Sequence, residues 1–117
     1  MDFEINKMYT RFDSRDIQQR TEELQSLGDD LTEEERSELN ELLRVREEVD
    51  SGDWDYGMTF IAEWDFADYA KELANDLGLV SDSAEWPLYL IDWTAAAREL
   101  SMDYVSVRIK DTDFWVR

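Results

Sequence analysis

The side chains of this sequence that could carry chemistry are almost all carboxylates. The chain of 117 residues has 30 Asp and Glu and contains neither His nor Cys. The commonest general base and the commonest strong nucleophile of enzymes are therefore missing. Carboxylate pairs support glycoside hydrolysis and metal-dependent chemistry, but 30 acids produce some pairs by chance, and no converging motif accompanies them. We therefore expect no catalytic residue and a protein that is not an enzyme.

Calcium binding is the metal chemistry that the acids around Asp50, Asp53 and Asp55 suggest. An EF-hand loop needs acids at positions 1, 3 and 5, Gly at 6 and Glu at 12. Counted from Asp53, Gly57 falls at position 5 and Trp64 at position 12, so the pattern fails. Asp in a Trp- and Gly-rich stretch is typical of turns. We expect no metal site and no cofactor, while loose divalent-ion binding stays open.

The charge balance limits the partners of the protein. The net charge is −18, from 30 acids against 12 bases. Such a charge excludes ordinary nucleic-acid binding and argues against binding an anionic membrane surface. The sequence shows no apolar stretch of membrane-spanning length and no export signal, which predicts a cytoplasmic protein. The expected partners are cationic.

The acids are concentrated in the middle of the chain. Residues 29–76 carry a net charge of −13, against −2 for residues 1–28 and −3 for residues 77–117. Two plain explanations exist, a solvated helix face and a halophile adaptation. Halophile proteins spread their acids more evenly over the surface.

Hydrophobic periodicity and capping residues predict four helices and a β-hairpin. The first two helices, 13–27 and 33–49, form an αα-hairpin, in which Asp13 caps the first and Thr32 with Glu35 forms a capping box on the second. The further helices are 66–77, capped by Asp65, and 93–100, capped by Asp92, and the strands of the hairpin are 104–109 and 114–116. Residues 58–61 are a strand or a buried connector. The fold class is α+β, mostly helical. We expect one acidic domain, with a helical hairpin region at 1–56 and an α+β region at 57–117.

The second helix is predicted to present an acidic face. Leu39, Leu42, Leu43 and Val49 fall on one side of the helical wheel and define the buried stripe. Glu34, Glu38, Glu41 and Glu48 lie within about 80° of one another and are predicted to face away from it. Like charges four residues apart destabilise a helix by roughly 0.2–0.5 kcal/mol per pair. A purely structural helix more often alternates Glu with Lys.

This density of charge suggests imitation of DNA. A duplex carries about one charge per 1.7 Å, so 18 charges correspond to about 30 Å of duplex, the size expected of a compact domain. A rigid array of carboxylates would attract the basic groove of a DNA-binding protein. The carboxylates expected to stand in for phosphates are Asp29, Asp30, Glu33, Glu34, Glu38, Glu41, Glu47, Glu48, Asp50, Asp53, Asp55, Glu63, Asp65, Asp68, Glu72 and Asp76. The Trp and Tyr residues at 54–69 are expected to be partly core and partly interface anchors.

The C-terminal part of the chain resembles a known family. The stretch LIDWTAAARELSMDYVSVRI, residues 90–109, is similar to the C-terminal segment of the ArdA-type antirestriction proteins. Both run from Ile-Asp-aromatic through an alanine-rich turn to Asp-Tyr and a strand. The matching residues here are Ile91, Asp92, Trp93, Ala97, Arg98, Glu99, Leu100, Asp103 and Tyr104. The resemblance covers about 60–117, includes the preceding DFADYAKELANDLGLV, and is shared with related small acidic phage proteins.

This resemblance implies a DNA mimic carried by phages or mobile elements, which occupies the DNA site of type I restriction enzymes. We therefore expect an inhibitor of a host DNA-binding defence complex, with either a restriction enzyme (antirestriction) or a CRISPR surveillance complex (anti-CRISPR) as target. The alternative is an acidic interaction or adaptor module without DNA mimicry. An aromatic content of 13% leaves room for an exposed apolar patch and a homodimer.

Overall fold

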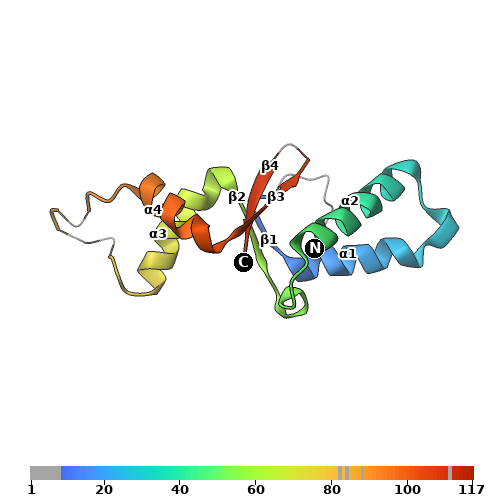
Figure 1. The fold of residues 1–117 in the computed structure, drawn as a ribbon, viewed down its shortest axis with the longest axis horizontal. Coiled ribbons are helices and arrows are strands. Elements are labelled where there is room, and N and C mark those ends of the chain that lie inside the picture. The colour runs from blue at the N-terminus through green and yellow to red at the C-terminus, as the bar shows by residue number, and fades with distance from the viewer. Residues whose placement is uncertain (1–8, 82, 84, 88, 111) are drawn as a thin grey trace.

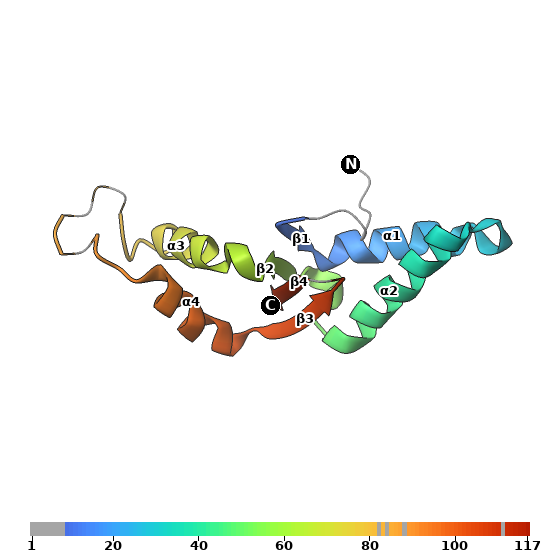
Figure 2. The same ribbon diagram turned by 90° about the horizontal axis from the view of Figure 1, so that it is seen from above.

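The protein is elongated, with a sheet at its centre and a pair of helices on each side (Figures 1 and 2). The computed structural model describes residues 9–81, 83, 85–87, 89–110 and 112–117, and the chain measures 61 × 26 × 24 Å along its principal axes. The described helices are α1 (Ser14–Ser26), α2 (Glu33–Val49), α3 (Phe66–Asp76) and α4 (Trp93–Leu100). The described strands are β1 (Arg11–Asp13), β2 (Thr59–Ala62), β3 (Val105–Ile109) and β4 (Thr112–Val116). The predicted class, mostly helical α+β, is confirmed.

Capping boxes begin both helices of the N-terminal αα-hairpin. The Asp13 side chain accepts from the backbone N–H at the start of α1, and Asp16 accepts from the Asp13 N–H at 2.9 Å. Thr32 and Glu35 exchange the same pair of hydrogen bonds at 3.1 Å each. These bonds satisfy N–H groups that have no partner within the helix. Both predicted helix starts are therefore confirmed.

The sheet is antiparallel throughout, with strand order β1-β2-β4-β3. Residues 58–61, expected to be either a strand or a buried connector, largely coincide with strand β2. Its partner β1 was not predicted. Phe12 of β1 lies opposite Phe60 of β2, and their rings stack with centroids 4.7 Å apart. The predicted C-terminal hairpin is present as β3 and β4, although Asp111 in its turn lies outside the described residues. The pairing of β1 with β2 joins the N-terminal region to the rest of the chain.

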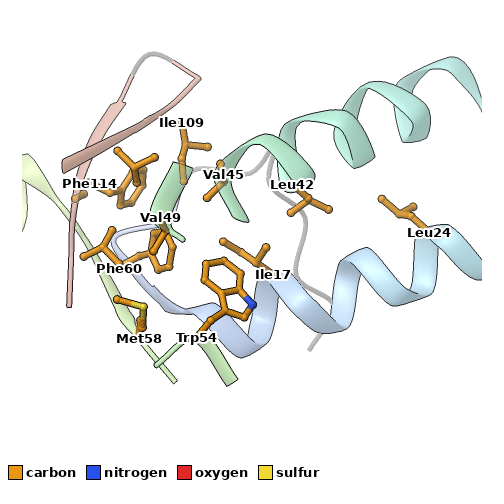
Figure 3. Close-up of a cluster of buried hydrophobic side chains, with 13 residues drawn as sticks. Ile17, Leu24, Leu42, Val45, Val49, Trp54, Met58, Phe60, Ile109 and Phe114 are labelled. Carbon is orange, nitrogen blue, oxygen red and sulfur yellow. The ribbon is translucent and has the colours of Figure 1, made fainter. Parts of the chain in front are cut away.

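The larger core lies between the sheet and the α1–α2 hairpin (Figure 3). Trp54 is 1% exposed, and its ring meets that of Phe60 edge-on at 6.1 Å. Ile17, Leu42 and Val45 enter the same cluster from the two helices, as Figure 3 shows. The guanidinium of Arg46 lies 4.7 Å above the Trp54 ring, where the charge meets the negative face of the indole.

A second, smaller core covers the opposite face of the sheet. Ile61 alternates with Phe60 along β2 and packs against Phe66 and Ala70 of α3 and Ala97 of α4. Phe60, Ile61 and their neighbour Ala62 are all fully buried. The sheet is therefore covered on both faces at β2, and it fixes the two helix pairs to one central layer.

Candidate acidic surface

One predicted phosphate mimic, Glu38, is buried between the two helices of the hairpin. Its side chain is 4% exposed and accepts from Nε and a terminal nitrogen of Arg20, at 2.9 and 3.0 Å. The prediction that Glu38 faces solvent is wrong. The buried face of α2 consists of Glu38, Leu42, Val45 and Val49, while Leu43 is 41% exposed. The true apolar stripe is rotated toward Val45, and this rotation places Glu38 against α1.

Asp65 is also buried, and it belongs to an ion-pair network that joins β1 to α3. Arg11 donates from Nε to Asp65 at 2.5 Å and from a terminal nitrogen to Glu72, and its guanidinium lies 5.3 Å from the Tyr69 ring centroid. The hydrogen bond to Glu72, followed by that to Asp65, raises the pKa of Arg11 although burial opposes the rise. Asp65 occupies the N-cap position of α3 but makes no capping hydrogen bond, so its predicted capping role is wrong.

Glu41 and Glu48 share a single arginine on the exposed side of α2. Arg44 donates to both carboxylates, and its hydrogen bond to Glu41 makes the largest contribution to a raised Arg44 pKa. The same guanidinium donates to the backbone carbonyl of Arg108 on the outer strand β3. These two carboxylates are therefore partly neutralised and help to cover the edge of the sheet.

The other eleven predicted carboxylates are exposed, and none has an ion-pair partner among the described residues. They fall into three groups. The distal acidic group, at the turn between α1 and α2, is Asp29, Asp30, Glu33 and Glu34. The basal acidic group, between the end of α2 and β2, is Glu47, Asp50, Asp53 and Asp55, and the remaining three are Glu63, Asp68 and Asp76. The distal group lies at the end of the α1–α2 hairpin that is remote from the sheet (Figure 1).

The charge per unit length is that of one DNA strand. A net charge of −18 over 61 Å gives about one net charge per 3.4 Å, the spacing of phosphates along a single strand and half the density of a duplex. The predicted length of about 30 Å is wrong, because the helix pairs lie on opposite sides of the sheet and do not pack together (Figure 2). Residues 14–57 hold 15 acids and five bases, so the hairpin region carries more than half of the excess.

Exposed aromatic and aliphatic side chains accompany these carboxylates. Of the aromatic residues at 54–69, Trp54 is buried, while Tyr56 is 84% exposed beside the basal acidic group and Trp64 is 62% exposed. The predicted core role is confirmed for Trp54, while the role of the exposed residues as interface anchors stays a prediction. Leu77, the last residue of the predicted helix 66–77, is exposed although it was expected on the apolar face of that helix. The connector between α3 and α4 exposes an apolar set that the sequence did not single out: Leu79, Trp86, Tyr89 and Leu90. The sequence feature that could have indicated this set is the presence of large apolar residues outside any periodic element.

Comparisons with protein-family models, with curated proteins and with solved structures found no match to this chain. Within the described ranges, no three acidic side chains come together in a group that could hold a metal ion. No helix in the part of the chain that the structure describes is long and apolar enough to cross a membrane.

Proposed function

We propose that this protein is a non-enzymatic DNA mimic of phage or mobile-element origin. It acts in the host cytoplasm, where it inhibits a DNA-binding defence complex by occupying the site that normally takes DNA. A restriction enzyme and a CRISPR surveillance complex both offer such a site. The partner surface is a basic groove, and the protein itself binds neither nucleic acid nor membrane.

The observation that carries this proposal is the density of unpaired carboxylates on a fixed scaffold. Eleven exposed carboxylates are spread along a body whose net charge per unit length equals that of one DNA strand. The distal acidic group follows a helix whose Leu24 is fully buried, and the basal acidic group flanks the buried Trp54. Backbone held in this way keeps the charges in place, so binding costs little ordering entropy.

The resemblance of residues 60–117 to ArdA-type proteins supports the same function. The residues that carry the resemblance serve the local fold: Asp92 accepts from the Ala95 N–H at 3.1 Å, and Ala97 is buried against α3. The shared stretch therefore describes a scaffold. The acidic hairpin, for which no resemblance was found, would supply most of the charge that the partner meets.

Competition with DNA tests the proposal directly. The purified protein is added to a type I restriction enzyme or a CRISPR surveillance complex, and the binding of a labelled duplex is measured over a range of salt concentrations. We expect DNA to be displaced and inhibition to weaken steeply with salt, because exposed charges are screened. Binding of the protein that leaves DNA loading unchanged would exclude mimicry.

A pair of charge-matched variants separates the arrangement of charge from its amount. Asp30→Asn with Glu33→Gln and Glu34→Gln removes three charges from the distal acidic group. Glu22→Gln with Glu85→Gln and Glu99→Gln removes three exposed charges elsewhere. At about 0.5 kcal/mol per exposed charge, the first variant should inhibit about tenfold less well and the second should change little. Equal losses in both would show that net charge alone matters.

The exposed apolar connector favours the alternative, an acidic adaptor module without mimicry. Large apolar patches mark protein–protein contacts, and Leu79, Trp86, Tyr89 and Leu90 are all exposed within this one connector. Trp86→Ala with Leu90→Ala would then abolish partner binding, while the distal charge variant would leave it intact. The mimic predicts the opposite ranking of the two variants.

A further inference from the structure

The tripeptide Ala-Glu-Trp occurs twice in the chain, at 62–64 and at 84–86. The first copy directly follows the buried residues of β2, and Ala62 itself is fully buried. Glu63 and Trp64 therefore project from a fixed frame. In the second copy, Glu85 and Trp86 are exposed in the connector between α3 and α4. The Glu-Trp pair thus occurs once beside the sheet and once in a connector away from it.

The first copy borders a pocket of about 310 Å³, lined by Glu63, Trp64, Arg108, Thr112 and Asp113. Trp64 is 62% exposed and makes no ring contact within the described part of the chain, so most of its indole is open to solvent. Arg108 and Asp113 pair with each other at 3.6 Å. Glu63 has no ion-pair partner among the described residues. The pocket therefore offers one uncompensated negative charge beside an open aromatic face.

We propose that this pocket receives one arginine side chain of the basic partner. A guanidinium can stack on an indole and donate to a carboxylate at the same time, and its planar fork suits both contacts better than an ammonium does. The pocket volume is at the lower limit of small-molecule sites, which fits one side chain. This inference takes one point from the proposed function, namely that the partner is a basic protein.

A neighbouring pocket of about 250 Å³ is a less suitable site for an arginine side chain. It shares Glu63 but also contains Arg98, so its two charges cancel. Its remaining walls are mostly apolar or aromatic, from Phe66, Ala67, Ala97 and Trp115. A cation entering there would meet the guanidinium of Arg98 with only Glu63 to offset it, whereas Arg108 of the first pocket is paired with Asp113. The arginine is therefore assigned to the side of Glu63 that carries Trp64.

Titration with N-acetyl-arginine amide tests the pocket without any partner protein. Each of the five tryptophans contributes one indole N–H signal to a proton–nitrogen spectrum, and Trp64→Phe identifies the one of interest. We expect that signal to shift saturably while the Trp86 signal does not. N-acetyl-citrulline amide has the same shape without charge and should produce no saturable shift. Equal responses to both compounds, or no response to either, would overturn the proposal.

The second Ala-Glu-Trp copy supplies matched control variants. Trp64→Ala and Glu63→Gln should each weaken arginine-amide binding about two- to fivefold, from the size of exposed cation–π and ion-pair contacts. The backbone N–H signals of Thr112 and Asp113, which line the same pocket, report binding to the Trp64 variant. Glu85→Gln and Trp86→Ala should leave the affinity unchanged, and equal losses from both sets would refute the site. Because DNA competition plays no part here, failure of this test is distinct from failure of the mimic proposal.

Discussion

Replacing Glu38 with Ala removes the acceptor of the ion pair that joins α1 to α2. Glu38 is 4% exposed and the Arg20 side chain 16% exposed, so the change leaves a largely buried guanidinium. Removing one partner of a buried pair costs about 3–5 kcal/mol. Arg20 keeps a contact with Glu23 at 3.4 Å, which places the expected loss near the lower limit, about 3 kcal/mol. For 117 residues this corresponds to a fall in Tm of about 12 °C.

Thermal and urea unfolding of Glu38→Ala and Glu34→Ala measure this difference within one helix. Glu34 is exposed one turn earlier, in the first turn of α2, and its loss should cost less than about 1 kcal/mol. Replacing Arg20 and Glu38 together by Met and Leu removes both charges of the pair and should recover most of the stability. The reasoning would be refuted if the Glu38 and Glu34 variants differed by less than about 0.5 kcal/mol.

Three further substitutions each test a single feature of the fold. Trp54→Ala should cost about 3–5 kcal/mol by chemical denaturation, because a 1%-exposed ring is removed from the core. Gly57→Ala should cost more than about 1 kcal/mol, since φ is +100° there and a Cβ would lie 2.9 Å from Nε of Arg15; an unchanged Tm would contradict this. Hydrogen bonds from Thr32 lower the pKa of Glu35. Its contribution to stability is therefore present above the unfolded pKa and is lost as pH falls through the folded one. The Tm difference between the wild type and Glu35→Gln should accordingly vanish in acid.

The helix boundaries could be predicted because their signals are local. Thr32 and Glu35 are three residues apart and need only each other to begin a helix. Strand β1 could not be predicted, because three residues are too few to show alternation and its partner is β2, far along the chain. The elongated arrangement, with one helix pair on each side of the sheet, was missed for a related reason. It depends on both faces of one strand being covered by helices from different parts of the chain.

The candidate surface was predictable where the carboxylates lie in turns. Asp29 and Asp53 are exposed because a turn between elements runs along the surface. Within α2 the prediction depended on counting leucines, and the exposed Leu43 shifted the apolar stripe away from Val45. Only the docking of α1 shows that Arg20 faces Glu38. Composition could indicate an acidic surface but could not tell which carboxylates the fold uses to hold itself together.

The elongated shape explains how a chain this acidic stays folded, and it predicts a specific response to salt. The distal and basal acidic groups lie at opposite ends of the 17-residue helix α2, about 25 Å apart. The Debye length is about 8 Å at 0.15 M salt but about 30 Å at 0.01 M. The groups therefore repel each other only in dilute buffer. We expect Tm, measured by circular dichroism, to rise with salt up to about 0.15 M and then to level off. A halophile adaptation predicts instead a rise that continues to molar salt, and that result would contradict this account of the charge.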